Sequence, residues 1–117
     1  MTSPILNQIG AVFIPVSDIE KSKQWYCRLL GLPIDEEVLF GHLFVIPMDG
    51  PGIVLDSKIF TSESVLNVPA FHLNTRDIDA AYDFVKECGA EILTDIEHDH
   101  WFNFKDPDGN VLMVCRS

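Results

Sequence analysis

The sequence predicts an α+β domain of two βαβββ modules, whose strands form a curled mixed sheet around a cleft. Three observations carry this prediction. Short apolar segments alternate with two amphipathic helical segments along the 117 residues. Landmarks of the first half recur in the second, since Asp18 and Asp77, like Asp49 and Asp108, are 59 residues apart. Apolar residues make up 47% and charged residues 22% of the chain, which is typical of a globular domain.

The first module is expected over residues 6–57. Residues 9–16 are almost entirely apolar and predict a buried strand. Ser17 and Glu20 have the spacing of a capping box, which starts a helix, and Gly31 has the position of a left-handed C-terminal cap. Three further strands are expected over residues 37–40, 42–46 and 52–56, the last two joined by a turn at Asp49-Gly50.

The second module is expected over residues 68–117, after a connector at residues 58–67 that has no clear period. Its elements repeat those of the first module: a strand over 68–74, a helix over 77–88 closed by Gly89, and strands over 91–94, 101–105 and 111–115. A chain of this length forms one domain. We therefore expect residues 1–117 to fold as a single pseudo-symmetric unit.

Charge and cysteine content restrict the partners and the compartment. The formal net charge of −10 repels phosphate backbones, so we expect neither nucleic acid nor an anionic membrane surface as a partner. A cationic or neutral small molecule remains compatible with that charge. No secretory signal or membrane-spanning segment is expected. Cys27, Cys88 and Cys115 are an odd number without a C-x-x-C pair, which favours reduced thiols in the cytoplasm.

Two segments resemble the vicinal-oxygen-chelate superfamily, which includes glyoxalase I, extradiol dioxygenases and the fosfomycin- and bleomycin-resistance proteins. Residues 16–22 lead to Trp25-Tyr26 and then to Leu30-Gly31-Leu32 in the first half. The more specific segment is Phe-Lys-Asp-Pro-Asp-Gly-Asn at residues 104–110. With the paired modules, the resemblance covers nearly the whole chain and implies the glyoxalase/bleomycin-resistance fold.

The resemblance also implies where metal ligands would stand, on inward-facing strand positions of the two modules. These positions are Ala11, Val54, Ala70 and Met113, and all four are apolar. A methyl group cannot bind a divalent metal, and a methionine sulfur suits copper(I) at best. We therefore expect no metal and no other cofactor, which puts metal-dependent glyoxalase, dioxygenase and fosfomycin-transferase chemistry in doubt.

Strand alternation, started from these positions, predicts which side chains line the cleft. Phe44 enters this set because the 59-residue offset relates it to Asn103, and the same offset relates His42 to Trp101. Such a lining binds planar or amphipathic molecules through burial and stacking, with polar groups that orient them. The predicted ligand-binding residues are Phe13, Phe44, Asp56, His72, Asn74, Trp101, Asn103, Lys105 and Met113.

Three functions compete. The first is a metal-independent small-molecule-binding protein that holds an aromatic or cationic compound in an apolar cleft, and the resemblance implies a homodimer whose clefts are completed across the two-fold axis. The second is a glyoxalase-like lyase or isomerase with a rearranged metal site, for which His72 and Asp56 are candidates, or with His72 as general base. The third is a non-catalytic module that serves a protein partner.

Overall fold

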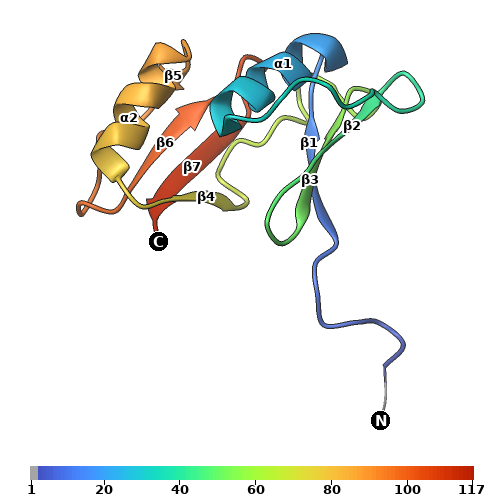
Figure 1. Ribbon diagram of the computed structural model, residues 1–117, viewed down its shortest axis with the longest axis horizontal. Coiled ribbons are helices and arrows are strands. Elements are labelled where there is room, and N and C mark those ends of the chain that lie inside the picture. Colours follow the sequence, from blue (N-terminus) through green and yellow to red (C-terminus); the bar gives the residue numbers. More distant parts are fainter. Residues whose placement is uncertain (1–2) are drawn as a thin grey trace.

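The computed structural model describes residues 3–117 and has two helices and seven strands there, arranged in two mixed sheets (Figure 1). Residues 1 and 2, which the predicted domain includes, lie outside the described residues. The first sheet has the order β1-β3-β2 and the second β4-β7-β6-β5. The elements are β1 (Ala11–Pro15), α1 (Ile19–Leu30), β2 (Leu43–Ile46), β3 (Gly52–Asp56), β4 (His72–Thr75), α2 (Ile78–Glu87), β5 (Glu91–Ile92), β6 (Trp101–Lys105) and β7 (Val111–Arg116).

The strand pairing confirms the predicted α+β class and its internal repeat. In each module the first strand runs parallel to the last, β1 with β3 and β4 with β7. The neighbouring strand is antiparallel in both modules, β2 with β3 and β6 with β7. Each module keeps its own mixed sheet, and residues 57–71 connect the two sheets without a helix or strand.

The first module lacks the strand predicted over residues 37–40. Leu39 forms only an isolated bridge with Leu43. Phe40 and Gly41 have positive φ angles of 54° and 76°, so the chain reverses where the strand was expected. The second module repeats this turn, with a bridge between Glu97 and Trp101.

Both helices begin at an aspartate. Asp18 accepts a hydrogen bond from the backbone N–H of Lys21 at 3.1 Å and caps α1, and Asp77 caps α2 in the same way. The predicted capping box was therefore wrong by one residue, because the Ser17 hydroxyl donates to Asp108 of the other module instead. Gly31 ends α1 with a φ of 67°, as predicted from its position.

The two modules share one core, formed by the faces of their sheets that the helices cover. Phe44 and Leu55 line this core from the first sheet, and Phe102 and Leu112 line it from the second. Tyr26 of α1 lies at the junction, where its hydroxyl donates to Oδ2 of Asp106 at 2.6 Å. Burial raises the pKa of Tyr26 well above 10, and the Asp106 charge adds to this shift.

The segment Asp106–Asn110 ties the modules together. Oδ1 of Asp106 accepts hydrogen bonds from the backbone N–H groups of Asp108 and Asn110, both at 2.9 Å. The Asn110 side chain, fully buried, donates to the carbonyl of Pro15 at 2.8 Å and accepts from the N–H of Leu66 at 2.9 Å. The turn that carries the resemblance therefore also fixes the end of β1.

Within residues 3–117, neither helix has the length and apolar character that crossing a bilayer requires.

Candidate ligand-binding faces

Each sheet has an open face, which we define as the face turned away from its own helix. On the first sheet this face carries Phe13 opposite Val54 and Pro15 opposite Asp56, because paired residues of neighbouring strands point the same way. Val45 of β2 adjoins Val54 there. Phe13 is 52% exposed and Val45 is 46% exposed, so large apolar groups face outward on this surface. Phe13 and Asp56 thus share the face on which alternation predicted them.

The open face of the second sheet brings together the other predicted ligand-binding residues, with the exception of Phe44. The register pairs His72 with Met113, and Asn103 also pairs with Met113 from the other side. The same alternation places the side chains of Asn74, Trp101 and Lys105 on this face.

The side chain of Trp101 makes a hydrogen bond within the described chain, whereas the side-chain oxygen of Asn103 makes none. The indole N–H of Trp101 donates to Glu97 at 2.9 Å, and the His98 ring lies 5.1 Å from the indole. The Oδ1 atom of Asn103 is buried and accepts no hydrogen bond from residues 3–117. Such an atom is costly to leave unpaired, which makes Asn103 a natural partner for a ligand N–H or O–H.

Phe44 was predicted on the wrong face. It pairs with Leu55 beneath α1, is 1% exposed, and has the Lys23 ammonium 5.2 Å from its ring centroid. The cause is a change of offset inside the repeat: Asp56 and Cys115 are 59 residues apart, whereas their partners Leu43 and Trp101 are 58 apart. A shift of one residue moves a strand side chain to the opposite face.

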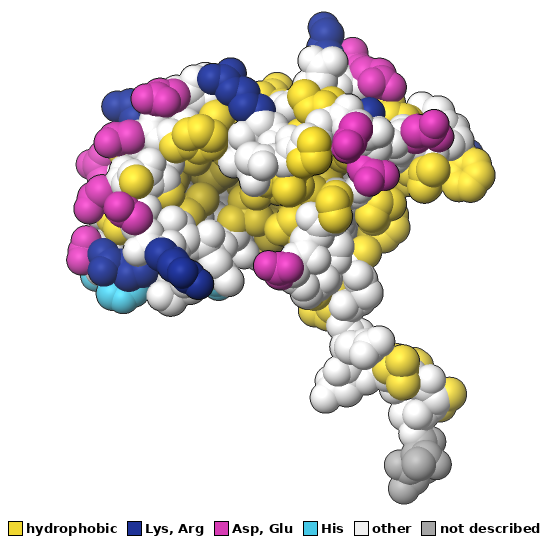
Figure 2. Space-filling model, in the orientation of Figure 1, with side chains coloured by type: hydrophobic (Ala, Val, Ile, Leu, Met, Phe, Trp, Pro, Cys, Tyr) yellow, Lys and Arg dark blue, Asp and Glu magenta, His cyan; other side chains and the backbone are white. Residues whose placement is uncertain are grey.

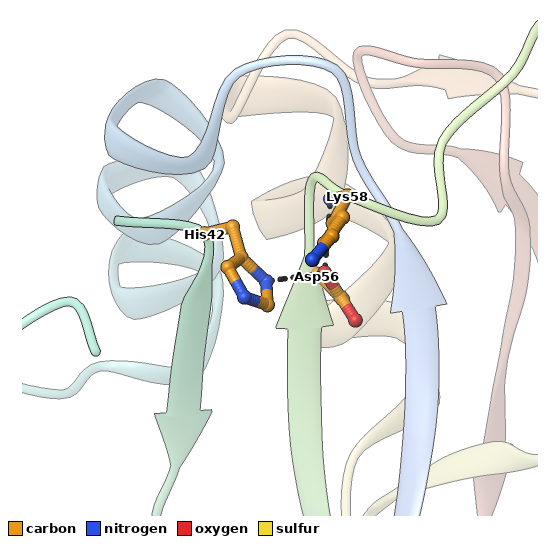
Figure 3. Close-up of polar contacts among 3 residues, drawn as sticks. All are labelled: His42, Asp56 and Lys58. Atoms are coloured by element: carbon orange, nitrogen blue, oxygen red, sulfur yellow. Dashed lines mark hydrogen bonds and ion pairs between the residues drawn. The ribbon is translucent and has the colours of Figure 1, made fainter. Parts of the chain in front are cut away.

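Asp56 pairs with a residue for which the sequence showed no partner. Oδ1 of Asp56 lies 2.9 Å from Nδ1 of His42 and accepts the backbone N–H of Lys58, also at 2.9 Å (Figure 3). The predicted pairing of Asp56 with His72 does not form, because His72 stands on β4 in the other module and is exposed. One feature of the sequence could have indicated this pair. His42 immediately precedes β2, and the first residue of β2, Leu43, lies opposite Asp56.

The four positions that resemblance assigns to metal ligands do not fit a divalent metal. Ala11, Val54 and Met113 stand on the open faces, and Ala70 precedes β4 at an exposed position. Their side chains offer one thioether sulfur and otherwise only carbon. Among residues 3–117, no three His, Cys, Asp or Glu side chains come together as a metal site requires.

A groove of about 690 Å³ lies between the modules, where Figure 2 shows apolar side chains gathered in a hollow. Of the predicted residues it contains His72 and Asn74. Its walls come mainly from the helix-covered side of the first sheet, the end of α1 and the segment before β4, and include Val12, Leu30, Leu32, Met48, Ile53, Phe71 and Leu73. A smaller hollow of about 310 Å³ beside Val45 is lined by Asp35, Glu36, Glu37 and Leu39.

The cysteines are free thiols in the described chain. Burial raises the pKa of Cys27 and of Cys88, which keeps both in the unreactive thiol form. Cys115 lies half-buried on the open face of the second sheet.

Known proteins share this fold along almost the whole chain. A curated relative, the uncharacterized protein YetH of Bacillus subtilis (strain 168), is 28% identical over 118 residues, which cover 94% of this chain and 98% of YetH. The crystal structure of TnmS3, an antibiotic binding protein from Streptomyces sp. CB03234, superimposes with a TM-score of 0.74 at 24% identity, covering 97% of this chain and 98% of TnmS3.

A second solved structure, a superfamily member from Sphaerobacter thermophilus DSM 20745, has a TM-score of 0.71 at 22% identity and covers 96% of this chain and 98% of its own. The model of one family matches residues 8–114, which is most of the sequence. The paired modules, the Asp106–Asn110 turn and this match agree: the chain belongs to the Glyoxalase/Bleomycin resistance protein/Dioxygenase superfamily.

Proposed function

We propose that this chain is a metal-independent small-molecule-binding protein of its superfamily, which holds an aromatic or cationic compound against its open faces. The observation that carries the proposal is the apolar character of Ala11, Val54, Ala70 and Met113, where metal ligands would be needed. What these faces offer instead is exposed apolar area with a few polar groups, which is the usual composition of a small-molecule site.

The neighbour TnmS3 supports the binding function, because it is an antibiotic binding protein with the same fold. The acidic surface supports a cationic ligand, since a net charge of −10 raises the local concentration of cations. The same charge argues against nucleic acid as a partner. Three free cysteines are compatible with a reducing cytoplasm.

We further propose that the protein acts as a homodimer. Within one chain the helix-covered faces pack together, and the open faces with Phe13 and Val45 stay exposed. A second copy would cover this apolar area and turn each open face into the wall of a cleft. The predicted ligand-binding residues other than Phe44 would then line that cleft.

Tryptophan fluorescence tests the proposal directly. Trp101 stands on an open face whereas Trp25 belongs to α1, so a ligand on the open face changes the emission of Trp101. We expect titration with a panel of aromatic cations to give saturable changes that persist after treatment with EDTA. The variant Trp101→Phe should lose the signal, and Trp25→Phe should keep it. Binding that EDTA abolishes would contradict metal independence, and silence across the panel would favour a protein partner.

The alternative of a lyase or isomerase with His72 as general base has less support. In residues 3–117 no carboxylate hydrogen-bonds His72, and Asp56 is held by His42. A general base needs a partner that orients it and stabilises its charged form.

A further inference from the structure

We propose that His42 and Asp56 form a recognition site for a protonated nitrogen, an amidinium or ammonium group carried by an aromatic ligand. The inference rests on the small-molecule binding proposed above. It assigns the cationic end of such a ligand to one place on the open face of the first sheet.

Asp56 is a buried carboxylate without a cationic partner from lysine or arginine. It is 5% exposed. Across residues 3–117, the only ion-pair contact of Asp56 is with His42, and the Lys58 ammonium pairs with no carboxylate. Burying a charged carboxylate is costly unless it is compensated. Here the compensation comes from the ring of His42 and one backbone N–H, which both meet Oδ1.

The other carboxylate oxygen, Oδ2, is an acceptor that the described chain leaves unused. None of the hydrogen bonds within residues 3–117 reaches it, and Figure 3 shows it pointing away from both His42 and Lys58. Asp56 shares its face with Pro15 and Leu43, so this oxygen belongs to the open side of the sheet. Asp56 is 5% exposed, and Oδ2 is not among the fully enclosed unpaired atoms of residues 3–117. A negatively charged oxygen that is largely shielded from water but still accessible, with a free lone pair, binds a cation more strongly than a fully solvated one does.

His42 orients the Asp56 carboxylate through one nitrogen of its ring. The Asp56 carboxylate only accepts hydrogen bonds, so Nδ1 of His42 carries the proton, and Nε2 lies on the side of the ring away from Asp56. Nε2 makes no hydrogen bond with residues 3–117, and the side chain is 28% exposed. Oδ2 of Asp56 is therefore the acceptor that meets the N–H donor of a cation, and His42 holds the carboxylate in place.

The surroundings favour a cation attached to an aromatic ring. Asp35, Glu36 and Glu37 line the small hollow at Val45, so the field at this face is negative. The floor is apolar, and Phe13 exposes half of its surface on the same side. A ring can pack there while its charged nitrogen reaches the pair.

The second module shows that the fold does not require this pair. His100 occupies the turn position that corresponds to His42, but its Nδ1 contacts the carbonyl oxygen of His98 at 2.6 Å. The residue that corresponds to Asp56 is Cys115. A hydrogen-bonded His–Asp pair therefore occurs in one module only, and His100 provides a matched control.

The test compares two probes of equal shape, benzamidine, a cation, and benzamide, which is neutral. Binding to the full ¹⁵N-labelled chain is followed by amide chemical shifts at neutral pH. We expect benzamidine to shift amides near Phe13, His42 and Asp56 and to bind about tenfold more tightly than benzamide. Asp56→Asn should reduce the affinity for benzamidine about tenfold, whereas His100→Asn should leave it unchanged.

Two further variants keep the test decisive should Asp56→Asn fail to fold. His42→Asn shortens the side chain that holds the Asp56 carboxylate in place, so the affinity should fall several-fold. Lys58→Gln removes a competing cation and should leave the affinity for benzamidine equal or higher.

Equal affinities for benzamidine and benzamide would overturn cation recognition while the binding of aromatic compounds stands. If neither probe shifts this face but fluorescence detects aromatic cations elsewhere, only the inference fails; if nothing binds anywhere, the proposed function fails with it.

Discussion

At the scale of single residues, Phe13 and Phe44 stand on opposite faces of the same sheet. Phe44 lies in the shared core at 1% exposure, and Phe13 is 52% exposed. Removing a buried ring loses its transfer free energy and leaves a cavity, whereas removing an exposed ring costs little.

This difference gives a matched pair of variants. Phe44→Ala should lower the free energy of unfolding by about 3–5 kcal/mol. Phe13→Ala should change it by about 0.5 kcal/mol or less and instead weaken binding of an aromatic ligand. Urea titration of both variants measures this, and equal losses would show that the faces are assigned incorrectly.

Tyr26 should make the free energy of unfolding decrease at high pH. Its pKa is raised by burial and by Asp106, so above about pH 10 only the unfolded chain loses the phenol proton. The contribution of Tyr26 is therefore complete well below pH 10 and decreases as the pH approaches and passes about 10.

Tyr26→Phe removes the hydrogen bond to a buried carboxylate and should cost about 2 kcal/mol at pH 8. That deficit should shrink as the pH rises from about 9 to 11. Denaturant titrations across this range provide the measurement. A deficit that stays constant with pH would mean that the Tyr26 phenol ionises equally in the folded and unfolded chains.

Alternation along strands grouped Phe13 with Asp56, and Asn103 with Trp101, on the sheet faces opposite the helices, because a strand whose face is known fixes every second residue. These faces were expected to point into a cleft between the modules, whereas within one chain they point outward. Alternation did not place Phe44, because the first module has one residue more than the second between its helix cap and this strand: Asp18 and Leu43 are 25 residues apart, whereas Asp77 and Trp101 are 24 apart. The pair of His42 with Asp56 was also beyond sequence reasoning, since it depends on where a turn ends relative to a strand register.

At the scale of elements, hydrogen bonds of the Asp106–Asn110 turn join the two modules. The Asn110 side chain bonds to Pro15 of β1 and to Leu66 of the connector, which are remote in sequence. Pro107, in the same turn, is exposed.

Asn110→Ala leaves the buried carbonyl of Pro15 without its side-chain donor and the N–H of Leu66 without its side-chain acceptor, which should cost about 2–4 kcal/mol. Pro107→Ala is the control and should stay within about 1 kcal/mol of the parent. Thermal unfolding distinguishes the two. Equal, small effects would mean that the turn does not hold the modules together.

The helices were predictable at this scale because their signals are local. Aspartate caps and Gly31 act through neighbouring backbone groups, although Asp18 rather than Ser17 is the cap. The strand predicted over residues 37–40 was not formed, because the positive φ angles of Phe40 and Gly41 reverse the chain. Apolar residues alone did not reveal this turn.

At the scale of the whole molecule, the sequence repeat predicted two modules, and the faces away from the helices were expected to line a cleft between them. The helix-covered faces form the common core, and the open faces point outward. Each face has enough apolar residues to serve as an interface, so composition could not decide between them.

The outward direction of the open faces yields a prediction about assembly. Val45→Asp places a charge on the exposed apolar face of the first sheet, and it should shift a homodimer toward monomers without unfolding the chain. Sedimentation equilibrium and circular dichroism report the two properties separately. A dimer that Val45→Asp leaves intact would place the interface elsewhere.

Metal content tests the central claim most directly, because the open faces carry carbon at the positions where a metal would need nitrogen or oxygen. Elemental analysis of protein purified without any chelator should find nickel, zinc, manganese and iron well below one atom per chain. A stoichiometric amount of any of them, retained through dialysis, would contradict the account.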